Sequence, residues 1–197
     1  MKPAIVYLLI CLIYHPLYGG NYSLKFDGTN DYVNIGNPTS GAFFGAGGEQ
    51  TISFWFKTTT SSGNWEMMLT NDTNANNPDM KVKITPSGNV ALGATGISDI
   101  TTSSAYNNGG GHHVVIVKTL ANTYDGVDGD WKCLELYVNA SSVGQLCADG
   151  QAFGRDIDFY LGALRSDGSN AYNGLIDEVK SDVIAKTLMV TKKKADC

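Results

Sequence analysis

Residues 131–147 read WKCLELYVNASSVGQLC, and this stretch predicts a β-hairpin. Apolar residues at 134, 136 and 138 alternate with Glu135 and Tyr137, which is the period of two expected for a strand with one face in a core. The polar residues Asn139 to Ser142 follow at once and predict a reversal of the chain. Two antiparallel strands that meet at this turn are therefore the element from which the rest of the fold is predicted.

The same hairpin predicts a disulfide between Cys133 and Cys147. If the turn centres on Ala140, positions whose numbers sum to 280 lie opposite each other, and the two cysteines form such a pair. Opposed residues of an antiparallel ladder have Cα atoms about 4.5 to 5.5 Å apart, and a disulfide tolerates about 4.4 to 6.8 Å. The alternative is two unrelated buried thiols. A disulfide would place the protein in an oxidising compartment.

The first 20 residues have the pattern of a secretory signal peptide. Lys2 precedes the apolar run from Ala4 to Tyr14, and Pro16 and the pair Gly19-Gly20 close it. The run is too short to span a bilayer, which takes about 20 apolar residues. We therefore expect residues 1–20 to be removed and the protein to be secreted and extracellular, with no insertion into a membrane. A noncleaved anchor is the alternative.

Removal of residues 1–20 leaves 13 basic and 19 acidic residues, a net charge of about −6. Such an acidic chain argues against binding to nucleic acid or anionic lipid. The remaining length suits one domain, predicted over residues 21–183, followed by a short basic tail over 184–197. Cys197 has no predicted partner, which suggests a free thiol or a disulfide to another chain.

Short alternating runs separated by Gly, Asn, Ser and Asp predict an all-β sandwich or barrel. In the run Thr51 to Lys57, Phe54 and Phe56 are expected in the core, whereas Trp55 is expected on a concave outer face. The predicted runs are residues 22–26, 31–35, 51–57, 65–69, 80–84, 89–92, 113–118, 134–138, 157–161 and 175–179.

Five of these segments, in this order, resemble a known fold family. They are SLKFDGTNDYVNIGN near the start, ISFWFK, HHVVIVK, LELYVN, and FYLGALRSDGSNAYNGLIDEV near the end. The order resembles the laminin-G-like and pentraxin-like branch of the concanavalin A-like lectin/glucanase superfamily, over about residues 22 to 180. The resemblance implies a jelly roll of two antiparallel sheets, each with six or seven strands, in which the first and last strands are neighbours.

The resemblance also implies where a hydrolase of this fold would carry its catalytic carboxylates. They would lie a few residues apart on one strand, in a Glu-x-Asp-x-x-Glu pattern, so that they point into a single cleft. The pattern does not occur here, because Glu49, Glu66, Glu135 and Glu178 stand apart from other acids except for Asp177. Neighbours on a strand point to opposite faces, so Asp177 and Glu178 are not expected to form a catalytic pair. The same reasoning excludes His112 and His113 as joint ligands of one metal ion. We therefore predict no enzymatic activity.

Calcium is the metal that the resemblance favours, because hard cations take clustered oxygens. The predicted set is Asp27, Asn30, Asp31 and Asp177, which the paired terminal strands would bring together. The alternative is that Asp27 and Asp31 only form turns, with their side chains capping backbone amides. A second acidic loop, over residues 125–130, lacks the spacing of an EF-hand and is read as a solvated turn.

Three sequons predict N-glycosylation, at Asn21, Asn71 and Asn139. Asn139 lies at the predicted hairpin turn and Asn71 in the polar segment NDTNANNPD, so both are expected to be accessible.

The leading functional hypothesis is a secreted, noncatalytic recognition or extracellular-matrix module that binds a glycan or a matrix protein, with calcium assistance. The alternatives are a structural matrix component linked through Cys197, and a divergent glycoside hydrolase. The missing carboxylate pattern disfavours the hydrolase.

Overall fold

The computed structural model describes residues 23–36, 49–72, 78–94, 97–120, 132–148, 158–165 and 167–182. Residues 1–20, Asn21, the loop 125–130, the tail and Cys197 lie outside these ranges, so the predictions made for them stay predictions. Within the described ranges every regular element is a strand, and no helix there is long and apolar enough to cross a membrane. The all-β prediction is confirmed.

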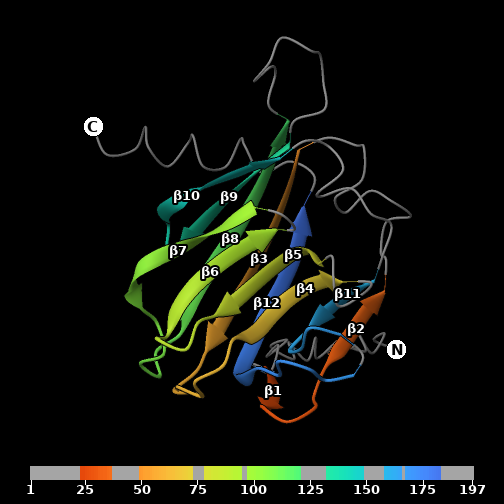
Figure 1. Cartoon of the computed structure of the whole chain (residues 1–197), viewed down its shortest axis with the longest axis vertical. Helices are drawn as coiled ribbons and strands as arrows, with labels where there is room; N and C mark the ends of the chain where they lie inside the picture. Colours follow the sequence, from red (N-terminus) through yellow and green to blue (C-terminus); the bar gives the residue numbers. More distant parts are fainter. Residues whose placement is uncertain are drawn as a thin grey trace, which may run out of the picture.

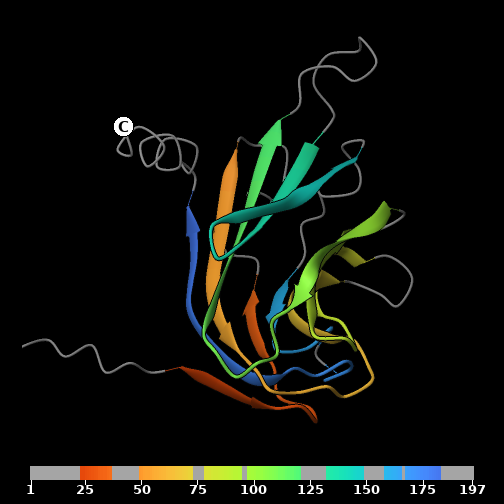
Figure 2. The ribbon, with the colours of Figure 1, turned by 90° about the vertical axis from the view of Figure 1, so that its left-hand side faces the viewer.

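The strands form two antiparallel sheets of six strands each, in the orders β1-β12-β3-β8-β9-β10 (sheet A) and β2-β11-β4-β5-β6-β7 (sheet B). The two sheets face each other as layers (Figures 1 and 2). The strands are β1 (Leu24–Asp27), β2 (Val33–Gly36), β3 (Gln50–Lys57), β4 (Glu66–Asp72), β5 (Pro78–Ile84), β6 (Asn89–Ala94), β7 (Ile97–Ala105), β8 (His112–Leu120), β9 (Lys132–Val138), β10 (Ser141–Ala148), β11 (Phe159–Leu161) and β12 (Asn173–Asp182).

The first and last strands are neighbours, as predicted, because β12 lies between β1 and β3 in sheet A. Phe26 on β1 packs edge-on against Tyr172, with ring centroids 6.1 Å apart, and the Tyr172 hydroxyl donates to the carbonyl of Lys57 at 3.0 Å. Gly162 has a φ of 81° and passes so close to the Phe26 ring that a side chain there would collide with it. These contacts tie the two ends of the domain to the core.

The core lies between the sheets and is built from the inward half of each alternating strand. Phe54 and Phe56 are 0% and 1% exposed, which confirms their predicted core positions, and Trp55 between them is 43% exposed. The inward residues of β8 and β9 (Val114, Ile116, Leu134, Leu136 and Val138) and those of β5 and β6 (Met80, Val82, Ile84, Val90 and Leu92) complete the same cluster.

The β9–β10 hairpin forms with Cys133 opposite Cys147, and the predicted disulfide joins them. The turn is tighter than predicted: Asn139 and Ala140 alone form it, with φ values of 49° and 65°, as in a two-residue type I′ turn. An irregularity between Ser142 and Gly144 shifts the register by one residue. Beyond this irregularity the numbers of opposed residues sum to 280, as predicted. Cys133 therefore faces Cys147 although the predicted turn centre is wrong.

A hydrogen-bonded histidine fixes the start of β8 against this turn. Asn139 accepts from the backbone N–H of His113 through Oδ1, which leaves its Nδ2 to donate to Nδ1 of His112 at 3.1 Å. Asn108 Oδ1 accepts from the N–H of Gly110 and lies 2.9 Å from Nε2 of His112. Since Nδ1 must accept, Nε2 carries the proton and donates to Asn108. The buried imidazole is therefore held in its neutral form.

Loss of the disulfide should destabilise the domain. Cys133 and Cys147 are 14 residues apart, and closing a loop of about that length contributes about 3 kcal/mol in the chain-entropy model. We expect the Cys133→Ala/Cys147→Ala double variant to melt about 6 to 12 °C below the wild type in a thermal unfolding experiment. A reductant should lower the melting temperature of the wild type and leave that of the double variant unchanged. Equal sensitivity of both proteins to reductant would contradict this account.

Acid should destabilise the domain through His112. Burial lowers the pKa of His112 below its usual value of about 6.5, so the unfolded chain binds the proton more tightly. Stability is then fully present above about pH 6.5 and is lost as the pH falls below it, by at most about 1.4 kcal/mol per pH unit for this proton. Melting temperatures between pH 8 and pH 5 should show this slope, and His112→Gln should flatten it. Parallel curves for the two proteins would show that His112 contributes nothing.

Candidate functional site

An open cleft of about 570 Å³ lies on the outer face of sheet A, and we call it the Trp55 cleft. It forms where β12, β3 and the segment before β8 meet. Its lining combines the exposed Trp55 ring and parts of the apolar residues Phe56 and Leu175 with charged and small residues, namely Ser23, Lys57, Gly111, Asp177 and Glu178. Pockets of this size that combine an apolar surface with a few polar groups are the usual binding sites for small ligands.

Alternation along β3 places Trp55 in the cleft. Phe54 and Phe56 point into the core, so Trp55 and Lys57 point outward. Trp55 lies opposite Asp177 of β12 on one side and opposite His113 of β8 on the other. The Trp55 and His113 rings pack with centroids 4.9 Å apart and planes inclined by 31°. The exposed outer position predicted for Trp55 is confirmed.

Partial burial and neighbouring charges act on His113. Desolvation lowers the pKa of His113, while Glu178 raises it and Lys180 lowers it. The histidine therefore supports the Trp55 ring chiefly as a neutral aromatic partner near neutral pH. His112 points to the inner side, where it packs against Phe56 and Tyr106. The expectation that the two histidines face opposite sides is thus confirmed.

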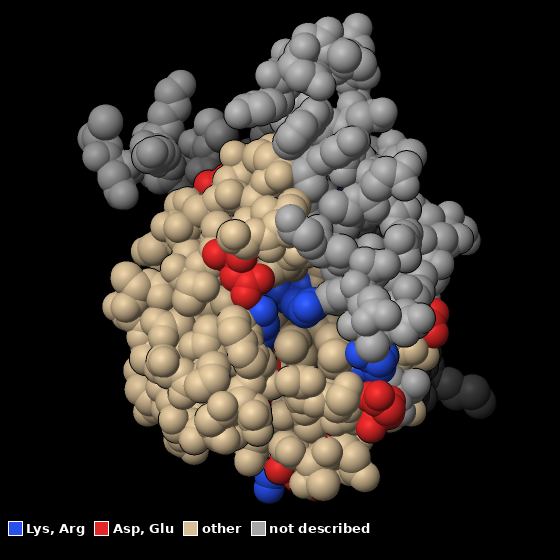
Figure 3. All heavy atoms as spheres, in the orientation of Figure 1, with Lys and Arg blue, Asp and Glu red and all other residues tan. Residues whose placement is uncertain are grey.

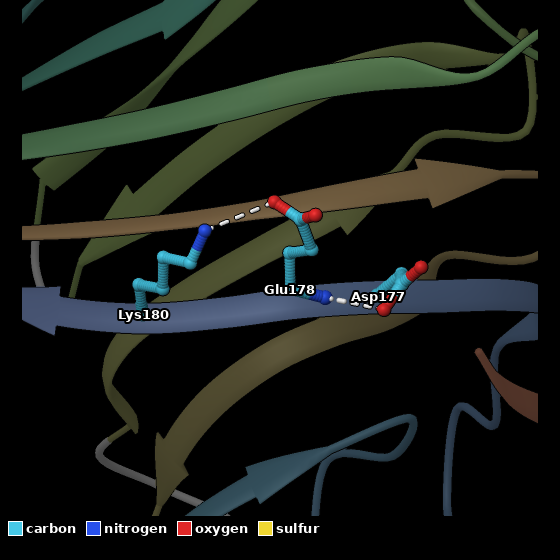
Figure 4. Close-up of polar contacts among 3 residues, drawn as sticks. All are labelled: Asp177, Glu178 and Lys180. Atoms are coloured by element: carbon cyan, nitrogen blue, oxygen red, sulfur yellow. Dashed lines mark hydrogen bonds and ion pairs between the residues drawn. The ribbon is translucent and has the colours of Figure 1, made fainter. Parts of the chain in front are cut away.

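A β-bulge in β12 brings two adjacent carboxylates to the same cleft. Asp177 pairs with Trp55 and Lys180 pairs with Ser53. The two residues between them on β12, Glu178 and Val179, therefore lie opposite the single residue Phe54 of β3. Glu178 has a φ of 49°, its N–H donates to Asp177 Oδ1 at 2.7 Å, and its Oε2 lies 3.0 Å from Lys180 Nζ (Figure 4). The prediction that Asp177 and Glu178 face opposite sides is therefore wrong, because the bulge interrupts the alternation on which it rested.

Glu178 is held in an unfavourable backbone conformation. The left-handed region costs a non-glycine residue about 1–2 kcal/mol, and such outliers persist only where the surrounding structure imposes them. Here the register shift between Asp177 and Lys180 imposes it. The sequence contains no glycine at this position that would have signalled the bulge.

The four residues predicted to bind calcium do not converge. Asp27 pairs with Asn173, and Asp177 lies four residues farther along β12, roughly 13 Å away at the usual rise per residue. Asp27 Oδ1 accepts from the N–H of Thr29, and Asp31 Oδ2 accepts from the N–H of Asp27. The two acids thus cap the turn after β1, which is the alternative that the sequence left open.

The arrangement of these four residues therefore does not fit a shared calcium site. Asn30 belongs to the same turn, where its backbone packs against Gly168. No group of three or more His, Cys, Asp or Glu side chains in the described part of the chain could hold a metal ion. Calcium binding itself stays a prediction, without the site geometry that the sequence proposed.

The asparagines of two of the three sequons lie in described segments, in opposite environments. Asn139 is an exposed turn residue, as expected. Asn71 is in β4 rather than in a loop, is 0% exposed, and neither of its amide atoms has a hydrogen-bond partner. The accessible position predicted for Asn71 is therefore wrong, because the strand extends into the polar segment and pairs with β5 and β11 on both sides.

A second exposed tryptophan, which the sequence did not single out, lies just before β4 of sheet B. Trp65 is 39% exposed, and Lys83 Nζ lies 3.6 Å above its ring. Lys83 also forms an ion pair with Asp99 at 2.6 Å, across the space left by Gly93. Figure 3 shows basic and acidic side chains side by side near the centre of this face. Lys83 covers one face of the Trp65 ring, and His113 packs against the Trp55 ring in a similar way, but the cleft described above is lined by Trp55 and not by Trp65.

Comparison with known proteins identifies the fold family. Residues 27–181 match the family model described as the concanavalin A-like lectin/glucanases superfamily, of the laminin G type. No curated protein matches the sequence.

Several solved structures share the fold at low sequence identity. The sialidase CBM40 of Ruminococcus gnavus bound to α2,3-sialyllactose is 16% identical, with a TM-score of 0.57 over 86% of this chain and 95% of that one. Domains LG4-5 of the mouse laminin α1 chain are 12% identical, with a TM-score of 0.59 over 83% and 43%. Domain 4 of the extracellular arabinanase AbnA from Geobacillus stearothermophilus, in complex with arabinotriose, is 16% identical, with a TM-score of 0.57 over 86% and 75%.

At these identities the similarity shows the fold and not the ligand. The family match covers most of the chain and agrees with the two-sheet architecture. The chain is therefore a laminin-G-like member of the concanavalin A-like lectin/glucanase superfamily.

Proposed function

We propose that this protein is a secreted, noncatalytic module that recognises glycans of the extracellular matrix, and that the Trp55 cleft holds the sugar. The observation that carries the proposal is the exposed Trp55 ring at an open cleft lined by hydrogen-bonding groups. An aromatic face offers a rigid apolar platform for the C–H face of a sugar ring. Asp177, Lys57 and Ser23 supply acceptors and donors for its hydroxyls.

The comparisons support this proposal at the level of the fold. Two of the similar structures hold saccharides, namely sialyllactose in the sialidase module and arabinotriose in the arabinanase domain. Laminin domains share the architecture. Glycan recognition is thus an activity that this fold supports, and the Trp55 cleft supplies suitable chemistry in this chain.

The arrangement of the carboxylates supports a noncatalytic role. Glycosidases place two carboxyl groups on opposite sides of the scissile bond, about 5 to 9.5 Å apart, one as the acid and one as the nucleophile or base. Here Asp177 and Glu178 are consecutive, Asp177 accepts a backbone N–H, and Glu178 pairs with Lys180. This arrangement suits the acceptance of hydrogen bonds from hydroxyl groups.

Secretion and calcium assistance enter the proposal from the sequence. The N-terminal pattern over residues 1–20 and the Cys133–Cys147 disulfide both agree with an oxidising, extracellular location. Calcium is tested most simply by running each binding experiment in millimolar calcium and in chelator.

Substitution of Trp55 should weaken glycan binding. We expect the wild type to bind at least one saccharide on a glycan array that includes lactose, arabinotriose and sialyllactose. Trp55→Ala should lower the affinity for that saccharide at least tenfold, about 1.4 kcal/mol, as measured by isothermal titration calorimetry. Because Trp55 is 43% exposed, the melting temperature should change little.

The matched control for this experiment is Trp65→Ala, which removes an exposed tryptophan from the other sheet. That variant should bind as the wild type does. If the array stays blank with and without calcium, glycan recognition is rejected. If Trp65→Ala loses binding and Trp55→Ala does not, the sugar site lies on sheet B.

Secretion from a eukaryotic host should add a glycan at Asn139 and none at Asn71. Ser141→Ala removes the sequon of Asn139 and keeps the Asn139 side chain, which the turn requires. Thr73→Ala removes the sequon of Asn71. Treatment with an N-glycosidase should shift the wild-type band on a gel, and Ser141→Ala should reduce that shift. A shift that depends on Thr73 would show that Asn71 is modified, contrary to its burial.

A further inference from the structure

Four described residues other than glycine have a positive φ, and Glu178 differs from the other three. Asn139 and Ala140 form the hairpin turn, and Asn170 lies in the turn before β12. Turns require such angles, and asparagine adopts them readily. Glu178 alone lies inside a strand. Glycine would occupy this position with the least backbone strain, yet the chain places a glutamate there.

The side chain of Glu178 is directed to the Trp55 cleft rather than to the core. It lines the cleft beside Asp177, and its carboxylate reaches toward Lys180 (Figure 4). Both partners of this ion pair are more than half exposed, at 56% and 67%, so water and ligand hydroxyls compete with it easily. The Glu178 carboxylate is therefore open to a further donor.

The groups next to Glu178 determine which hydrogen-bonding groups a ligand needs. Asp177 Oδ1 is engaged by the N–H of Glu178, which fixes that carboxylate one strand away from the Trp55 ring. Ionised carboxylates only accept hydrogen bonds, so a ligand between Trp55, Asp177 and Glu178 must supply donors. Neutral sugars supply them as hydroxyl groups. An acidic group on the sugar supplies no donor to these two carboxylates and adds a like charge beside them. The cations nearby are Lys57, which also lines the cleft, and Lys180, which is already paired with Glu178.

We propose that the bulge at Glu178 makes the Trp55 cleft a site for uncharged, hydroxyl-rich saccharides, with Glu178 and Asp177 as hydroxyl acceptors and Trp55 as the stacking surface. This inference rests on the proposed glycan-binding function and narrows its ligand class. It sets the cleft apart from a site for acidic sugars such as sialyllactose.

The test compares three variants of the full chain. Glu178→Gly relieves the backbone strain at this position and removes the carboxylate acceptor. Glu178→Gln keeps the size of the side chain and removes its charge. Ala140→Gly relieves a similar backbone strain in a turn outside the cleft. The probes are arabinotriose and lactose as neutral saccharides, and α2,3- and α2,6-sialyllactose as acidic ones. Affinity is measured by titration calorimetry, and stability by thermal unfolding.

We expect the neutral probes to bind the wild type more tightly than the sialylated ones. Glu178→Gly should raise the melting temperature by about 2 °C and weaken binding at least tenfold, and Glu178→Gln should weaken binding without raising the melting temperature. Ala140→Gly should raise the melting temperature and leave affinity unchanged. A variant that becomes more stable as it loses its ligand shows that Glu178 serves binding and not folding.

Two results overturn the inference and leave glycan recognition standing. One is wild-type affinity in both Glu178 variants, which makes the bulge incidental to the site. The other is tighter binding of the sialyllactoses than of the neutral probes, which reverses the ligand class. If the wild type binds neither these four probes nor any other saccharide of the array, in calcium or in chelator, the proposed function is rejected and this inference with it.

Discussion

The insertion of β12 between β1 and β3 is the constraint on which the rest of this structure depends. It joins the two ends of the domain, buries Phe26 against Tyr172, and fixes which residues of β12 face Trp55. These pairings are non-local, because they connect positions about 120 to 150 residues apart in the chain. A shift of β12 by one residue would exchange its core and solvent faces. The core contacts of Phe26 and Ile176 therefore set the register that builds the cleft.

The cleft depends both on regular strand pairing and on the bulge that interrupts it. Regular pairing aligns Asp177, Trp55 and His113 in one row across three strands of sheet A. The bulge then adds Glu178 to the same face, where strict alternation would have turned it away. Two carboxylates thus reach one site from consecutive positions. The rigid strands on either side keep the aromatic ring and the acceptors at fixed separations, as a preorganised binding surface requires.

Local sequence signals predicted part of the fold correctly, namely the Cys133–Cys147 pairing and the core positions of Phe54 and Phe56. The adjacency of the terminal strands, which is non-local, was implied by the family resemblance and is also correct. Strand β7 was missed because its sequence, ISDITTSSA, is mostly polar, and in the structure it is an edge strand with few buried residues. Such a strand is formed by pairing with β6 rather than by its own apolar pattern.

The candidate site was harder to predict, because it depends on exceptions to regular strand geometry. The calcium set assumed that neighbouring strands bring Asp27 and Asp177 together, but adjacency does not fix register, and the pairing of Asp27 with Asn173 keeps the two acids apart. No cation is then needed to offset their repulsion. The hydrogen bonds of Asp27 and Asp31 to backbone N–H groups instead stabilise the turn that leads from sheet A to sheet B. The remaining acid, Asp177, lies instead beside Glu178 and Trp55 in the lining of the Trp55 cleft, where its carboxylate belongs to the proposed ligand site rather than to the predicted calcium set.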